Sequence, residues 1–198
     1  MNKLILVSGR KQTGKDTLAE LFVETGYQRV ALADQLKFQT LQLLNDIVVP
    51  KNKLTFQDFF ENKEMVVDIM ALKQTPKTAT IRRWLQRYSM LIKEMLGTYY
   101  WADMLIKEIR EYHLEKHLVV ADVRFPYEIE RFYDQLALNY DIHLIRILRD
   151  TGYNDQDISE TALDDYNEEA FDFIIDNNAS MEDLKKKFDK IFKKIHKR

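Results

Sequence analysis

The amino-acid sequence predicts an α/β fold of three layers, in which helices flank a five-stranded, mostly parallel β-sheet. Two observations lead to this prediction. Apolar runs of strand length alternate along the chain with segments whose apolar residues recur at helical spacing. The first apolar run, residues 3–8, leads through a glycine-bounded loop directly into a helix. We expect right-handed crossovers between the parallel strands.

The five expected strands are short apolar runs that are each followed by polar or turn-forming residues. In chain order they occupy residues 3–8, 28–32, 117–122, 142–148 and 171–176. Polar residues at the ends of several strands, such as Asp122 and Arg149, are expected at the carboxyl edge of the sheet, where open parallel sheets bind their ligands.

The expected helices keep their apolar residues three or four positions apart. In chain order they cover residues 17–23, 33–47, 80–96, 101–112, 126–136 and 180–195. We expect Asp34 and Ser180 to serve as N-caps, Pro126 to lie in a first turn, and Gly97 to end the helix before it.

Residues 9–17 read Gly-Arg-Lys-Gln-Thr-Gly-Lys-Asp-Thr, and the strand before them and the helix after them are the context of a phosphate-binding P-loop. Gly9 and Gly14 let the backbone approach an anion closely. The N–H groups of the loop and of the helix N-terminus would point at the phosphates, and Lys15 would reach the β- and γ-phosphates. We therefore expect ATP to bind at residues Gly9, Lys11, Thr13, Gly14, Lys15, Asp16 and Thr17.

One position departs from the general motif. Asp16 follows the loop lysine, where the motif has the Ser or Thr that binds Mg²⁺, and Thr17 comes one position later. Either Asp16 contacts the metal, directly or through water, or Thr17 serves the phosphate instead. The sequence leaves both alternatives open.

Charged residues follow two other strands. Asp122 ends the strand 117–122 in a Walker-B-like pattern, in which a carboxylate binds or orients Mg²⁺, and Arg124 lies two residues on. Asp34 and Lys37 follow the strand 28–32. The alternative interpretations are an N-terminal cap with a surface arginine for the first pair and a plain helix cap for Asp34.

Two segments are expected to extend the sheet domain. Residues 48–78 show no strand pattern, and the apolar residues between Pro50 and Pro76 indicate one or two helices that would form a flap over a substrate. The polar segment 151–166 is expected to be a mobile loop that closes over ATP. We therefore expect a single domain over residues 1–198, with a helical insertion at about 48–100 and a lid-like loop at about 150–166.

Composition excludes several classes of protein. Hydrophobic residues make up 45% of the 198 residues, which is enough for a sizeable core and argues against disorder. The net charge of −2 argues against a general nucleic-acid binder, and the absence of cysteine excludes disulfides and thiolate metal sites. No apolar run approaches the length needed to span a membrane. We expect a cytoplasmic protein without nucleic-acid or membrane partners.

A P-loop is shared by kinases, GTPases and motor ATPases. The chain lacks the Asn-Lys-x-Asp of a GTPase, because neither Asn52-Lys53 nor Asn62-Lys63 is completed by the aspartate, and motor ATPases are usually larger. Arginines on several elements suit phosphoryl transfer to a small acceptor, which needs charge neutralisation more than a covalent residue. The alternative from another class is a protein that holds a nucleotide without transferring phosphate.

Several of these motifs occur together in one known family. They are Gly-x4-Gly-Lys-Asp-Thr, Ala33-Asp34-x-Leu36-Lys37, Arg83-x2-Gln86, Trp101, Asp122-x-Arg124 with Glu128, and Ile158-Ser159-Glu160. In this combination, from Leu4 to about Asn178, the chain resembles the deoxynucleoside monophosphate kinases, typically virus-encoded members of the nucleoside monophosphate kinase superfamily. Phosphomevalonate and dephospho-coenzyme A kinases share parts of the pattern and remain the alternative within the enzymes.

The resemblance implies that ATP and a dNMP give ADP and a dNDP, with Mg²⁺. Lys15, Arg124 and Arg149 would act on the transferring and neighbouring phosphates, and Arg83 would hold the acceptor phosphate. Asp122, with Asp16 as the second candidate, would organise magnesium.

The acceptor pocket, by the same resemblance, would be lined by Asp34, Lys37, Gln86, Arg83, Asp122 and Arg124. Trp101 would either support a base or belong to the core, and Ser159 and Glu160 would belong to the closing loop or its anchor. Small-molecule nucleotides are the expected partners, the compartment is the host cytoplasm if the protein is viral, and a homodimer is left open.

Overall fold

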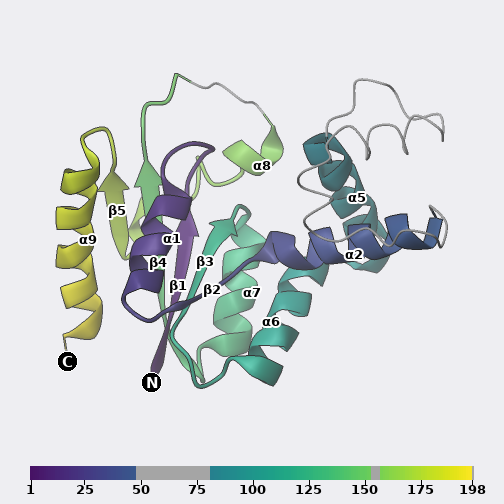
Figure 1. Ribbon diagram of the computed structural model, residues 1–198, viewed down its shortest axis with the longest axis horizontal. Helices are drawn as coiled ribbons and strands as arrows, with labels where there is room; N and C mark the ends of the chain where they lie inside the picture. Colours follow the sequence, from purple (N-terminus) through teal and green to yellow (C-terminus); the bar gives the residue numbers. More distant parts are fainter. Residues whose placement is uncertain (48–80, 153–156, 198) are drawn as a thin grey trace. The chain divides into compact units, whose positions relative to one another are not determined.

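The computed structural model describes residues 1–47, 81–152 and 157–197; the side chains of residues 41–47 and 81–84 are outside the description (Figure 1). Most of the expected helical insertion, residues 48–78, therefore lies outside the described residues. The chain divides into two compact units, one formed by Met1–Leu32 with Ala102–Arg198 and the other by Ala33–Trp101. The expected single domain with an insertion and a lid stays a prediction.

The first unit is built on a five-stranded sheet whose strand order is β2-β3-β1-β4-β5. In chain order the strands are β1 (Asn2–Ser8), β2 (Gln28–Val30), β3 (Leu118–Val123), β4 (Tyr140–Leu148) and β5 (Phe173–Asp176). All four neighbouring pairs are parallel. The predicted parallel α/β sheet is confirmed, and the strand that precedes the glycine-bounded loop lies at its centre.

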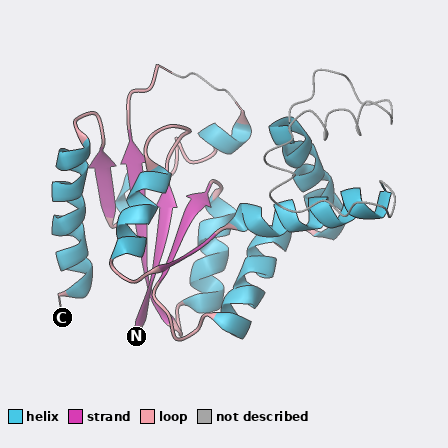
Figure 2. Ribbon diagram, in the orientation of Figure 1, coloured by secondary structure: helices cyan, strands magenta, loops and turns pink. Residues whose placement is uncertain are grey.

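Helices cover both faces of this sheet (Figure 2). On one face α1 (Lys15–Glu24) and α9 (Met181–His196) pack on residues such as Ile5 and Val7 of β1. On the other face α6 (Tyr100–Tyr112) and α7 (Pro126–Leu136) pack on residues such as Leu4 and Leu6. These four β1 side chains are fully buried, which is why the strand reads as a continuous apolar run rather than an alternating one.

Three of the expected helix boundaries are confirmed. Ser180 caps α9, since its side chain accepts the N–H of Asp183 at 3.2 Å. Pro126 is the first residue of α7. Gly97 follows α5 (Ile81–Leu96) with φ +104°, a conformation that glycine adopts without steric cost.

The expected N-cap at Asp34 is wrong. Helix α2 (Leu32–Ile47) begins two residues earlier, so Asp34 lies inside its first turn. The reason is a long-range contact, because the Asp122 carboxylate on β3 accepts the N–H of Leu32 at 3.0 Å. A carboxylate that satisfies an N–H of the first turn does the work of a local cap from a distant strand.

The segment expected to be a loop, residues 151–166, carries one short helix, and a 3-10 turn follows the segment. Helix α8 spans Ile158–Thr161 and a 3-10 turn, η1, spans Glu168–Ala170. Asp157 caps α8 by accepting the N–H of Ser159 at 2.8 Å and its hydroxyl at 2.6 Å. Residues 153–156 lie outside the described residues, and closure of the segment over a ligand stays a prediction.

The second unit contains most of α2, all of α5 and the first residues of α6. Gln39 Nε2 donates to the Tyr100 hydroxyl at 2.9 Å, and Trp101 Nε1 donates to the carbonyl of Ser89 at 3.4 Å. Trp101 is 5% exposed, which agrees with its interpretation as a core residue. Among the described helices none has the length and apolarity to cross a bilayer.

The α1–α9 face gives a stability prediction. Phe22 on α1 is fully buried, and its ring lies 5.0 Å from Phe188, 5.1 Å from Tyr27 and 6.4 Å from Phe192, centroid to centroid. Phe22→Ala should lower the free energy of unfolding by about 3–5 kcal/mol, since it removes packing and leaves a cavity. Urea denaturation measures this. Leu138→Ala, at a 96% exposed position, should change it by less than about 0.5 kcal/mol, and equal effects would contradict the packing described.

Candidate active site

The glycine-bounded loop joins β1 to α1 at the carboxyl edge of the sheet. Its two glycines are required because the loop backbone lies too close to neighbouring atoms to leave room for a side chain. A Cβ atom on Gly9 would lie 2.4 Å from the carbonyl oxygen of Ile147, and one on Gly14 would lie 2.5 Å from Asn177 Nδ2. Gly14 also has φ +104°, which L side chains rarely adopt. The loop backbone therefore packs directly against the ends of β4 and β5.

Asn177, just after β5, holds the loop in this position. Its amide nitrogen donates to the carbonyl of Thr13 at 2.8 Å, and both side chains are buried. The Thr13 hydroxyl in turn donates to the carbonyl of Arg10 at 2.8 Å. Sequence reasoning gave Asn177 no role in the site. Asn177 comes directly after the last strand, at the edge of the sheet where the loop lies, and this position could have indicated a contact with the loop.

Lys15 is the first residue of α1 and is 8% exposed. Its ammonium donates to the carbonyls of Gly9 and Arg10, both at 2.6 Å, so it lies within the curve of the loop. Burial, followed by repulsion from Arg124, lowers the pKa of Lys15 to about 8, while Glu160 and two aspartates oppose the shift. The loop thus keeps a cation at its centre that a phosphate would stabilise.

The two candidates next to Lys15 have different surroundings. Asp16 forms an ion pair with Arg29 of β2, and its side chain is 80% exposed. Thr17, one residue on, is half-buried on α1. Contact of Asp16 with a metal and contact of Thr17 with a phosphate both stay predictions.

Arg124 follows β3 and reaches the same loop. Its Nη1 donates to a carboxylate oxygen of Glu160 at 2.6 Å and to the carbonyl of Ser159 at 3.1 Å. Its backbone N–H donates to Glu128 at 2.8 Å, and the same Glu128 oxygen accepts the N–H of Phe125 at 3.1 Å in the first turn of α7. Both the backbone and the guanidinium of Arg124 are therefore held.

A second arginine pair lies beside it. Asp164 binds the guanidinium groups of Arg10, on the loop, and Arg146, on β4, with the Arg146 contact at 3.2 Å. This carboxylate raises the pKa of Arg10 above its ordinary value. Sequence reasoning missed Arg146, although an arginine between the apolar residues Ile145 and Ile147 of a strand was a signal.

One cavity joins these groups at the edge of the sheet. It is lined by Ser8, Gly9, Arg10, Val123, Arg124, Arg146, Ser159, Glu160, Leu163 and Asp164. Of the predicted site residues, Gly9 and Arg124 lie on this cavity. Arg149 is exposed just after β4 and does not line it, so its role stays a prediction.

The predicted magnesium ligands are acidic residues from two elements. Asp122 on β3 accepts the N–H of Leu32 and lies close enough to Lys15 to influence the pKa of that lysine. In the described part of the chain no three His, Asp or Glu side chains gather as a metal site. Mg²⁺ in phosphotransfer sites is usually bound by one or two carboxylates together with substrate phosphates, and Asp122 fits that chemistry.

Four of the six predicted acceptor-site residues belong to the second unit and are described within it, whereas Asp122 and Arg124 belong to the first. Asp34 and Lys37, one turn apart on α2, form an ion pair at 3.1 Å. Gln86 is half-buried on α5. The backbone of Arg83 lies on the same helix, and its side chain is outside the described residues.

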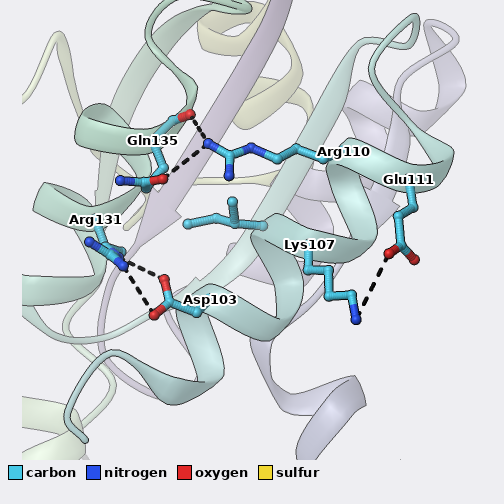
Figure 3. Close-up of a pocket in the computed structure, with 7 residues that line it drawn as sticks. Asp103, Lys107, Arg110, Glu111, Arg131 and Gln135 are labelled. Carbon is cyan, nitrogen blue, oxygen red and sulfur yellow. Dashed lines mark hydrogen bonds and ion pairs between the residues drawn. The ribbon is translucent and has the colours of Figure 1, made fainter.

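A larger groove lies elsewhere, between α6 and α7 (Figure 3). It measures about 430 Å³, and its charged side chains are engaged with one another. Arg131 pairs with Asp103 at 2.6 Å, and Arg110 donates to the backbone and side chain of Gln135. This groove contains neither the loop nor the arginines that line the cavity beside it.

Comparison with known proteins gives a family and a fold. The family model described as deoxynucleotide monophosphate kinase matches residues 36–188. This match begins after the phosphate loop, so the loop at residues 9–17 is an independent observation. No protein with a curated description matches the sequence significantly.

Solved structures show the same fold at low sequence identity. Dephospho-CoA kinase from Campylobacter jejuni has a TM-score of 0.52 at 13% identity, with 98% of this chain and 97% of that chain covered. TT1252 from Thermus thermophilus has a TM-score of 0.52 at 16% identity, with 99% of each chain covered. A sugar kinase from Janibacter sp. has a TM-score of 0.51 at 9% identity, with 100% of each chain covered.

The anchor at Asn177 gives a second prediction. Asn177→Ala leaves the buried carbonyl of Thr13 without its donor and should lower the free energy of unfolding by about 1–3 kcal/mol. It should also weaken ATP binding, measured by calorimetry, because the loop loses its support. Asn139→Ala, at an exposed position between α7 and β4, is the matched control. Unchanged stability and ATP affinity in Asn177→Ala would show that the loop does not depend on this bond.

The lowered pKa of Lys15 gives a pH prediction. Lys15 is charged below its pKa of about 8 and neutral above it, so kcat/KM for ATP should fall as pH rises through 8. In the nucleotide complex the phosphates stabilise the charged form, so kcat should stay constant to a higher pH. Steady-state kinetics between pH 6.5 and 10 tests this. A kcat/KM that stays flat across the range would contradict the role given to Lys15.

Proposed function

The chain belongs to the deoxynucleotide monophosphate kinase family, and from this premise we propose that it transfers the γ-phosphoryl group of ATP to a deoxynucleoside monophosphate. The products are ADP and the deoxynucleoside diphosphate. The observation on which the proposal depends most is the convergence of the phosphate loop, Lys15 and Arg124 at one edge of the sheet. Transfer between two anions requires such cations, since charge must be neutralised on donor and acceptor together.

The loop supplies the donor site. Its N–H groups and the N-terminus of α1 bind the β-phosphate, and Lys15 exchanges the carbonyls of Gly9 and Arg10 for phosphate oxygens. Arg124 binds the transferring group or the acceptor phosphate. Arg149 and Arg83 are further candidates for these phosphates, and Asp34, Lys37 and Gln86 are candidates for the acceptor pocket.

In the proposed reaction an oxygen of the acceptor phosphate forms a bond to the γ-phosphorus while the bond from that phosphorus to the ADP oxygen breaks. The acceptor phosphate has a second pKa near 6, so its oxygen is already largely deprotonated at pH 7 and no general base is needed. Bound Mg²⁺ would neutralise charge on the phosphates. Asp122 would orient it, with Asp16 as the second candidate.

A kinase of another small phosphorylated acceptor and a nucleotide-binding protein without transfer are outcomes that the assay below distinguishes. Virus-encoded origin, a cytoplasmic location and a homodimer stay predictions.

The purified protein, incubated with ATP and Mg²⁺, should form ADP when one or more of the four dNMPs is added. ADP release is followed for each dNMP separately, with AMP and dephospho-coenzyme A as further acceptors. Turnover with a dNMP supports the proposal and identifies the preferred base. Turnover with dephospho-coenzyme A alone, or ATP binding without turnover on any acceptor, would overturn it.

Lys15→Ala should lower kcat about 100- to 1,000-fold in that assay, the magnitude found when one charge-stabilising donor is removed from an active site. Lys190→Ala, at an exposed position of α9, is the matched control and should retain full activity. Near-full turnover by Lys15→Ala would refute the phosphate-loop mechanism, because that variant lacks the central cation.

A further inference from the structure

We propose that Glu160 is a positioning residue for this reaction. Its carboxylate fixes the Arg124 guanidinium beside the phosphate loop and, through its second oxygen, fixes the loop backbone. The inference rests on the proposed function for the reaction that Arg124 serves. The contacts among Glu160, Arg124 and Lys11 are observations that stand independently of that function.

The first step is the burial of Glu160. Its side chain is 1% exposed, and a buried carboxylate is stable only when its charge is paired and hydrogen-bonded. One oxygen accepts Nη1 of Arg124 at 2.6 Å and the other accepts the backbone N–H of Lys11 at 2.7 Å. The carboxylate therefore bridges β3 and the loop, two elements that must keep a fixed spacing if they are to bind one phosphate group.

The second step is how Glu160 holds Arg124. Within the described residues the guanidinium makes its hydrogen bonds through Nη1, to Glu160 and to Ser159. Arginine presents five N–H donors in a rigid planar fork, so Nε and Nη2 remain for a ligand. The side chain is 31% exposed, which leaves it accessible. One edge of the fork is thus anchored by protein while the other suits a bidentate phosphate contact.

The third step is that Glu160 is itself held. It lies on α8, whose N-terminus is capped by Asp157, and its own N–H donates to the carbonyl of Asp157 at 2.8 Å. Four residues on, Asp164 binds Arg10 and Arg146. The carboxylate is therefore positioned by a structured segment with several contacts to the loop and sheet.

Glu160→Gln is the test, because it removes the charge while nearly keeping the shape. We expect kcat with the preferred dNMP to fall about 10- to 100-fold, the cost of a misplaced catalytic group, while KM for ATP changes less than about threefold. Glu168→Gln, at an exposed position of η1, is the matched control and should keep wild-type kinetics.

A double-mutant cycle separates positioning from a purely structural role. If the charge of Glu160 acts through Arg124, Glu160→Gln should change kcat less than about twofold in an Arg124→Ala background, because the amide oxygen of the glutamine can still accept the N–H of Lys11. A further 10- to 100-fold loss in that background would overturn the proposal, since Glu160 would then act independently of the arginine.

A readout that needs no turnover completes the test. In ¹⁵N-arginine-labelled protein, an anchored guanidinium gives separate Nη1 and Nη2 signals for Arg124, and Glu160→Gln should average them by freeing rotation about Nε–Cζ. Wild-type protein that turns over no dNMP would refute the proposed function alone. Arg124 signals unchanged by Glu160→Gln would refute the positioning role, whatever the substrate.

Discussion

The direct packing of the phosphate loop on the carboxyl edge of the sheet is the constraint on which the rest of the site depends. Gly9 lies against the end of β4, Gly14 lies against Asn177, and the Asn177 amide binds the carbonyl of Thr13. A side chain at either glycine would push the loop away from the strands. Because the loop is held this closely, α1 begins at Lys15 with its first N–H groups at the sheet edge, the geometry that favours an anion.

The close packing of the loop on the sheet also explains why the cations of the site need carboxylate partners. Arg10, Arg124 and Arg146 line one cavity, and Arg124 also lies close enough to Lys15 to lower the pKa of that lysine. Holding these cations near one another would be unfavourable without partners. Glu160 and Asp164, from the segment that includes α8, supply those partners. The result is a group of cations whose mutual repulsion is relieved by protein carboxylates. A phosphate group is likewise an anion that accepts several hydrogen bonds, and this likeness is the physical basis of the proposed phosphoryl transfer.

Local patterns in the sequence predicted most of the fold, and long-range contacts account for the differences. The apolar runs located all five strands, and the glycine spacing located the loop, because both depend on neighbouring residues. The start of α2 was missed because the residue that satisfies its first turn, Asp122, is ninety positions away. Asn177 and Arg146 were missed for the same reason, since their partners Thr13 and Asp164 are distant in sequence. Arg149 was predicted as a phosphate-binding residue because it follows a strand, whereas Arg146, three residues earlier, lines the cavity.

In the proposed mechanism the loop and Arg124 bind the phosphates of one reaction. A crystal structure with Mg²⁺, a non-hydrolysable ATP analogue and a dNMP tests it most directly. We predict the β-phosphate within hydrogen-bonding distance of the loop N–H groups and Lys15, with Arg124 on a phosphate of the donor or the acceptor. Phosphates bound away from the loop, for example in the groove between α6 and α7, would contradict the account.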